Sequence, residues 1–207
     1  MREYSKFDEI IATLQRTYSS TMPLDTEKLD EHTDEELASN ERLLAANLMR
    51  VNHSGEVAAQ ALYLGQYLAA NREDTRSHMK RCADEELAHL HWCEERLQEL
   101  ESKPSVLAPV WFIGCLTIGF IVGKFGDEVS YSFTAETEHQ VAKHLNDHLE
   151  RLPEKDIRSR AILSTMLEDE TAHMQDAFNK TNFSLPKRVK SLMTLGGEAL
   201  RKISLKI

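Results

Sequence analysis

The sequence predicts an all-α protein built on a four-helix bundle, and three observations support this prediction. The chain has few residues that interrupt helices, with 5 prolines and 8 glycines among 207 residues. Apolar residues recur at helical spacing along most of its length. Two short polar breaks divide the helical stretches into two hairpins. A chain of this length suits one domain, so residues 1–207 are treated as a single unit.

Each hairpin consists of two helical stretches around a turn-type break. Four helices are expected, over residues 40–70, 76–101, about 126–150 and 157–179. The first break is "NREDT" at residues 71–75, and the second is "RLPEKD", which is centred on Pro153. Pro104 ends the second helix, because the residue before a proline disfavours helical geometry.

An uncharged stretch, "VLAPVWFIGCLTIGFIVG" at residues 106–123, joins the two hairpins. Eighteen helical residues cover about 27 Å, so this stretch can carry the chain back along the bundle. Eighteen apolar residues could also span a bilayer. Pro109 and three glycines interrupt the run, and a spanning helix would place the hairpins on opposite sides of a membrane. A long crossover along the bundle is therefore the preferred interpretation.

The two ends of the chain differ in charge. Residues 1–39 form a polar, acidic lead without the apolar stretch of a signal peptide. Residues 186–207 form a basic amphipathic tail. From Thr181 onward there are six Lys or Arg and one Glu, so this end sums to +5 while the rest of the chain sums to −14. The net charge of −9 excludes general nucleic-acid binding, and three cysteines without a C-x-x-C pair indicate reduced thiols.

A glutamate precedes a histidine by three residues at three places. These pairs are Glu86 with His89, Glu136 with His139, and Glu170 with His173. On a helix the two side chains of each pair lie on one face, one turn apart, as metal ligands often do. An acid-rich chain also contains such pairs by chance, so position in the bundle has to distinguish them.

Distance from the hairpin turns distinguishes four glutamates. Glu86 lies 14 residues after the first turn and Glu56 lies 16 before it, while Glu170 and Glu138 lie 16 residues on either side of the second. At 1.5 Å per residue, all four lie about 21–24 Å from their turn. The chain therefore resembles a duplicated unit, in which a lone glutamate faces a Glu-x-x-His pair across each hairpin.

Helical phase favours Glu138 over Glu136. Glu138 shares a stripe with Val141, Ala142 and Leu145, whereas Glu136 shares one with polar residues. Two residues are about 200° apart on a helix, so only one of the two glutamates is expected to face the core, and Glu136 is expected to face water. Glu56 lies on a mixed stripe and has the weakest support from periodicity.

Four carboxylates in one core are costly unless positive charge neutralises them. Two divalent metal ions would supply that charge, and carboxylates with two imidazoles and no thiolate favour iron or manganese. One Glu from each of two helices and a Glu-x-x-His from each of the other two is the two-metal arrangement of ferritin-like bundles. The expected fold is therefore a ferritin-like four-helix bundle with a long apolar crossover and a C-terminal basic amphipathic helix.

Four motifs give the chain a family resemblance. "RVNHSGEVAAQALYLGQ" at residues 50–66, "EELAHL", "ETEHQVAKHLNDHLERL" and "DETAHMQDA" resemble the demethoxyubiquinone hydroxylases of ubiquinone biosynthesis, over about residues 40–205. The resemblance implies a di-iron centre in which Glu86 and Glu170 bridge the two ions. It implies six iron ligands: Glu56, Glu86, His89, Glu138, Glu170 and His173. Ser54 replaces an alanine that many relatives carry.

The resemblance also implies a reaction and a location. The implied enzyme is a di-iron monooxygenase that uses O2, and reducing equivalents ultimately from NADH, to hydroxylate the ring of a polyprenylated benzoquinol. The expected location is peripheral, on an anionic membrane surface at the cytoplasmic side of the cell inner membrane, with other ubiquinone-biosynthesis proteins as candidate partners. A ferritin-like iron-oxidising storage or detoxification protein is the main alternative, and a non-enzymatic membrane-associated adaptor is a second.

Several further residues are candidates for supporting roles. Glu85 and Asp169 directly precede the bridging glutamates and could accept hydrogen bonds from the ligand histidines, although solvated surface positions are equally expected. Tyr63 and His144 could face the site as proton donors, and packed core positions are the alternative. Gly55, in mid-helix beside Glu56, could leave space for oxygen or substrate, although close helix packing is the commoner reason for such a glycine.

Overall fold

The computed structural model describes Ile11 and residues 36–206. This part of the chain is all-helical, as predicted. Its helices are α2 (Ser39–Ala69), α3 (Glu73–Glu99), α4 (Ala108–Lys124), α5 (Asp127–Arg151), α6 (Ile157–Asn179) and α7 (Lys187–Ser204). The acidic lead predicted for residues 1–39 lies almost entirely outside the described residues.

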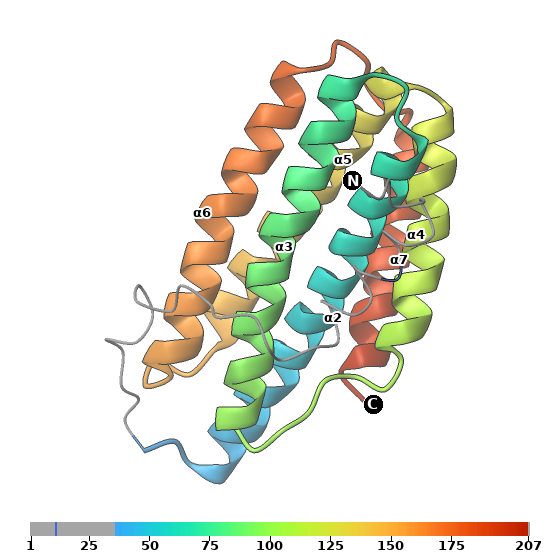
Figure 1. Cartoon of the computed structure of the whole chain (residues 1–207). Coiled ribbons are helices and arrows are strands. Elements are labelled where there is room, and N and C mark those ends of the chain that lie inside the picture. The colour runs from blue at the N-terminus through green and yellow to red at the C-terminus, as the bar shows by residue number, and fades with distance from the viewer. Residues whose placement is uncertain (1–10, 12–35, 207) are drawn as a thin grey trace, which may run out of the picture.

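Four helices form the bundle, and two lie against its outside. Helices α2 and α3 form one antiparallel hairpin, and α5 and α6 form the other (Figure 1). Helix α4 returns along α2 and confirms the predicted crossover, while α7 packs against α2 and α5. Among the described residues, none of the helices combines the length and apolar character needed to cross a bilayer.

The bundle core is apolar toward the end where α3 finishes and α6 begins. It contains fully buried leucines, methionines and a cysteine from all four bundle helices: Leu48, Met49, Cys93, Leu97, Leu145, Leu163 and Met166. A buried ionic contact closes that end. Arg96 of α3 donates to Asp156 at 2.9 Å and to Ser159 at 2.9 Å, so it joins α3 to the start of α6. Nothing in the sequence pattern marked this contact.

Glycines bring α2 and α4 into close contact. A Cβ atom on Gly119 would lie 2.1 Å from the Leu62 carbonyl oxygen, and one on Gly65 would lie 2.3 Å from that of Leu116. A Cβ on Gly123 would meet the Ala69 side chain at 2.6 Å. Two of the three glycines that interrupt the apolar run therefore allow the crossover to lie directly on the backbone of α2.

An ion pair ties the first half of α7 to α5 and corrects the prediction for Glu136. That glutamate does not face water: it is buried, its carboxylate lies 2.7 Å from Lys190 Nζ, and Gln140 donates to it at 2.8 Å. The phase argument placed it correctly outside the ligand-bearing stripe. It failed on exposure because α7 packs over the face that the stripe analysis assigned to solvent.

The two partners of this ion pair are expected to differ in their effects. Glu136→Ala removes the buried carboxylate and leaves Lys190, which is already 37% exposed, to solvent. This variant should lower the free energy of unfolding by only about 1 kcal/mol. Lys190→Ala should lower the free energy of unfolding by more, because it leaves the buried carboxylate without its cation. Urea unfolding measures both variants, and amide exchange should become faster along α7 in each. Equal costs would contradict this asymmetry, and lost metal binding in Glu136→Ala would contradict the position of Glu136 outside the centre.

Candidate metal centre

Six side chains from all four bundle helices meet in one buried layer. Their ligand atoms form two groups, each with its atoms within 4.8 Å of one another. The first group is Glu56, Glu86, His89 and Glu170, and the second is Glu86, Glu138, Glu170 and His173. Because Glu86 and Glu170 belong to both groups, the layer has two overlapping positions for a metal ion, with these two carboxylates between them.

The sequence produces this layer through helical spacing. Each Glu-x-x-His pair lies on one face of its helix, one turn apart, and the lone glutamates come to the same level from the facing helices. The mixed stripe of α2 is a buried polar stripe, since Asn52, Gln60 and Tyr63 are all inaccessible to solvent together with Glu56. All six predicted residues therefore lie in the layer.

Most buried carboxylate oxygens of this layer lack a hydrogen-bond partner among the described residues. These are both oxygens of Glu86 and of Glu138 and one each of Glu56 and Glu170, and His89 Nδ1 also lacks one. Buried polar atoms are normally satisfied, so such a concentration indicates a missing partner. Two divalent cations would balance four carboxylates, and oxygen with imidazole donors fits iron or manganese. The residues present therefore fit a two-metal centre.

Burial and close contact between the acids shift the pKa values of the side chains in this layer. Burial raises the pKa of Glu56 and of Glu138 well above the usual range, and nearby carboxylates add to the rise. Burial alone would raise the pKa of Glu170 too, but contacts with His173 and His89 lower it. Burial opposes protonation of His173, yet hydrogen bonds to Glu170 and Glu85 raise its pKa to about 10. Without metal, protons balance the acids, so metal binding should release protons.

Two carboxylates outside the layer orient the histidines. His173 Nε2 on α6 lies 2.9 Å from Glu85 of α3, and His89 Nε2 on α3 lies 3.1 Å from Asp169 of α6. Each hairpin thus supplies the carboxylate that holds the other hairpin's imidazole. The Nδ1 atoms face the shared carboxylates, with His89 Nδ1 3.1 Å from Glu170 and His173 Nδ1 3.3 Å from it. A metal ion bound in this layer would therefore meet the Nδ1 atoms, with the ring proton of each histidine on Nε2.

Removing one of these outer carboxylates should weaken metal binding without removing a ligand. Asp169→Ala frees the His89 ring to rotate and removes the acceptor of its proton, so metal affinity is expected to fall about 10- to 100-fold. Competition with a chromogenic chelator measures that loss. Glu168→Ala, at the exposed neighbouring position, is the control and should bind metal as the unaltered chain does. Unchanged affinity in Asp169→Ala would show that the contact orients nothing.

The other candidate residues lie near the layer but outside it. Tyr63 is fully buried, and its hydroxyl has no hydrogen-bond partner within Ile11 and residues 36–206. His144 contacts the Asn52 side-chain oxygen at 3.2 Å, and His148 contacts the same oxygen at 2.8 Å. Sequence reasoning missed this Asn52 contact. It also missed Trp92, whose ring centroid lies 5.2 Å from that of His89, and no spacing signal would have revealed either.

The fold and the layer together define a class. A search of solved structures finds similarity to a dodecameric thioferritin, the bacterioferritin-related protein from Bacteroides fragilis, with a TM-score of 0.56 and 18% identity over 74% of this chain and 89% of that one. At this identity the likeness concerns the fold alone. The chain is a ferritin-like helical bundle with a buried cluster of four carboxylates and two imidazoles.

Sequence comparison then gives the family. Residues 43–203 match the model of the ubiquinone biosynthesis protein COQ7, and the chain belongs to that family. It is 52% identical over 160 residues to a 3-demethoxyubiquinol 3-hydroxylase from Cupriavidus pinatubonensis, covering 77% of each chain. It is 44% identical to the enzyme of the same name from Acinetobacter baylyi, with 99% of each chain covered.

Proposed function

We propose that this chain hydroxylates the ring of a polyprenylated demethoxyubiquinol, using dioxygen at a di-iron centre held by the six-residue layer. The observation that carries the proposal is the pair of overlapping ligand groups sharing Glu86 and Glu170, in a chain of the COQ7 family. Reducing equivalents would come ultimately from NADH. The bound iron pair would supply the redox chemistry that spin-restricted dioxygen requires.

The chain's own residues fix the geometry of that chemistry. Glu86 and Glu170, which belong to both ligand groups, would each bind both ions, and Glu85 and Asp169 orient the imidazoles of His173 and His89. The apolar core on one side of the layer excludes water. A Cβ on Gly55, next to Glu56, would make an ordinary van der Waals contact with His144 Cε1 of α5 at 3.9 Å, so the gap between α2 and α5 at this level has room for a methyl group.

The direct test supplies iron-loaded protein with a short-chain demethoxyquinol, a reductant and oxygen. Mass spectrometry should find a product one oxygen atom heavier than the substrate. A storage protein would instead oxidise added iron and retain more of it than two positions can hold, while leaving the quinol unchanged. Hydroxylation by iron-free protein would show that the proposed centre is not responsible.

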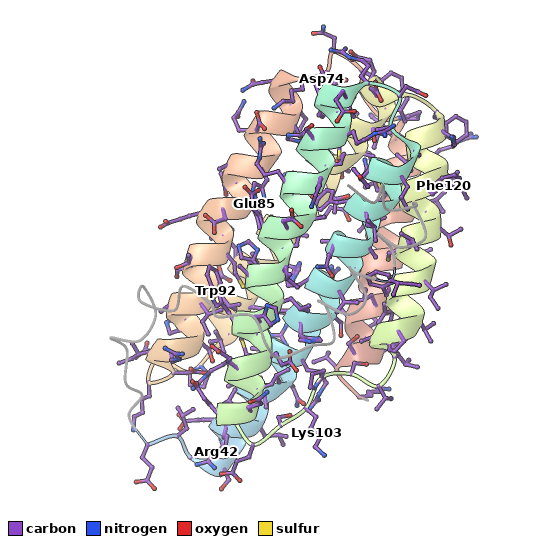
Figure 2. All side chains as sticks on the ribbon, in the orientation of Figure 1. Arg42, Asp74, Glu85, Trp92, Lys103 and Phe120 are labelled. Atoms are coloured by element: carbon purple, nitrogen blue, oxygen red, sulfur yellow. The ribbon has the colours of Figure 1, made fainter. Side chains whose placement is uncertain are left out.

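We also propose that the protein binds peripherally to anionic membrane, at the cytoplasmic face of the inner membrane. A polyprenylated quinol resides in the bilayer, and α4 and α7 lie on the side of the bundle away from α6 (Figure 1). Both helices expose apolar residues: Val110, Ile113, Ile118, Phe120 and Ile121 on α4, and Leu192, Leu195 and Ile203 on α7. Figure 2 shows Phe120 projecting away from the bundle. The same helix α7 also carries exposed lysine and arginine side chains. Each such cation contributes about 1 kcal/mol to the free energy of binding near anionic lipid.

Vesicle cosedimentation tests this proposal. Vesicles with anionic lipid should bring the protein down, high salt should weaken the binding, and deletion of residues 186–207 should weaken it further. Equal binding to neutral vesicles would remove the electrostatic part of the proposal. Absence of binding at low salt would mean that α4 and α7 serve only to cover the bundle. Other proteins of ubiquinone biosynthesis are candidate partners, and pull-down on anionic vesicles would identify them.

A further inference from the structure

Trp92 places an aromatic ring directly beside the metal layer. It lies one turn after His89 on α3 (Figure 2), and the two ring centroids are 5.2 Å apart with 39° between the ring planes. On this face of α3, Trp92 lies between His89 and Arg96, which both contact carboxylates at α6. Trp92 therefore lies on the side of α3 that faces α6, in contact with a proposed metal ligand.

The indole of Trp92 also reaches the protein surface. Its side chain packs against the apolar core next to the layer and stays partly exposed. Its Nε1 atom is buried and has no hydrogen-bond partner among the described residues, although a buried indole N–H usually has one. Packing therefore holds this ring in place, and the ring connects a ligand imidazole to solvent.

Three oxidisable side chains near the layer, in contrast, are closed to solvent. Cys93 of α3 and Met166 of α6 each lie one turn from a proposed ligand, and both are inaccessible. Tyr63 is equally buried, and its hydroxyl has no acceptor in the described part of the chain. A phenol must release its proton to be oxidised readily, whereas an indole can lose an electron and keep its N–H proton. Of these four side chains, only Trp92 combines partial exposure, contact with a ligand and oxidation without a proton acceptor.

The proposed chemistry creates a need for such a ring whenever dioxygen arrives before the quinol. Dioxygen reduced at the layer would then leave oxidising equivalents that no substrate takes up. Side chains next to the ions would be oxidised instead, and an oxidised imidazole would be lost as a ligand. A ring that contacts the layer and is open to solvent can supply electrons before this happens.

We propose that Trp92 donates electrons to the metal layer through His89 when no quinol is bound, and so protects the ligands from oxidation. In each event the indole loses one electron, the oxidised centre gains it, and the N–H proton stays on the ring. A small reductant in solution, such as ascorbate or a thiol, then returns one electron to the exposed part of the indole and is itself oxidised by one electron. This inference rests on the proposed function, because iron and dioxygen supply the oxidant.

Peptide mapping of the unaltered chain tests the proposal, because the chain has 2 tryptophans. Iron-loaded protein is cycled with oxygen and limiting ascorbate, without quinol. Oxygen should be added at Trp92 and not at Trp111. Excess ascorbate should prevent this by restoring the ring, whereas it would increase oxidation by free hydroxyl radicals.

Trp111 is the matched control for this mapping. It is also partly exposed, and its buried Nε1 likewise lacks a partner among the described residues. It lies on α4, however, which contributes no residue to the layer. Equal oxidation of both tryptophans, or an intact Trp92 after iron and oxygen have reacted, would overturn the proposal.

Trp92→Phe and Trp111→Phe test the protection of the ligands. After cycles of iron and oxygen without quinol, each protein is stripped of metal and its capacity to rebind cobalt is measured, which does not depend on hydroxylation. Trp92→Phe should lose this capacity several times faster than Trp111→Phe and the unaltered chain, with oxygen added to the peptide that carries His89. Equal losses from equal starting cobalt content would overturn the proposal. If Trp92→Phe does not fold, the mapping of the unaltered chain decides.

Hydroxylation with quinol present is measured in parallel and separates the two proposals. A chain that hydroxylates the quinol but keeps Trp92 intact in its absence would overturn this inference alone. A chain that oxidises Trp92 but never the quinol would overturn the proposed function and leave the electron route through Trp92 standing.

Discussion

Glu86→Ala and Glu170→Ala should each lose most of both metal ions and all measurable hydroxylation. Each carboxylate belongs to both ligand groups, so its removal opens both positions at once. Losing a lone glutamate has a different expected result. Glu138→Ala should also abolish hydroxylation, but it removes a ligand from only one group, so about half of the metal should remain.

The metal-free proteins provide the control for this prediction. Glu138 is fully buried, both of its oxygens lack hydrogen-bond partners in the described part of the chain, and burial raises its pKa well above the usual range. Without metal it is therefore a cost to the fold, and Glu138→Ala should raise the free energy of unfolding by about 1–3 kcal/mol. Urea unfolding with and without metal measures this. A variant that is destabilised in both states would indicate a structural residue, and full metal content in Glu170→Ala would refute the shared-ligand assignment.

Gly119→Ala should be the most destabilising single-methyl change among the glycines of α4. The added Cβ would lie 2.1 Å from the Leu62 carbonyl oxygen and 2.9 Å from its Cα, and backbone atoms of a packed helix cannot move aside. Helix α4 must therefore move away from α2. The free energy of unfolding should fall by about 3 kcal/mol, the upper end of what overpacking a core costs.

Gly114→Ala is the matched control for that prediction. Gly114 lies in the same helix, and a Cβ there meets no atom of the described residues within 4 Å. Alanine is a better helix former than glycine, so this variant should be more stable by about 0.5–1 kcal/mol. Thermal unfolding of the two variants should shift in opposite directions. Equal shifts would contradict the close contact between α4 and α2.

The metal layer could be predicted from the sequence because it depends on intrahelical spacing and distance from a turn. Glu138 lies in the layer and Glu136 does not, because residues two apart on a helix point in nearly opposite directions. The environment of Glu136 could not be predicted, because it depends on where α7 lies after folding. The partners of Glu85 and Asp169 belong to the facing hairpin. Only the register of α3 against α6 decides whether such acids meet a histidine or water.

The apolar stretch before α5 was likewise predictable in its course but not in its contacts. Its length and lack of charge predicted a crossover, and the structure confirms it. In the sequence its glycines interrupt an apolar run, and in the structure Gly119 and Gly123 allow close approach to α2. A pattern of small residues does not state which surface it will meet, so the contact with Leu62 and Ala69 required the folded structure.

The most direct test of the di-iron hydroxylase assignment follows the oxygen atom. Iron-loaded protein reacts with a short-chain demethoxyquinol and reductant under isotopically labelled dioxygen, and the product ring is analysed by mass spectrometry. The assignment predicts that the new ring oxygen carries the label, that iron-loaded Glu136→Ala also gives labelled product, and that Glu170→Ala gives none. Unlabelled product, or oxidised iron with an unchanged quinol, would contradict it.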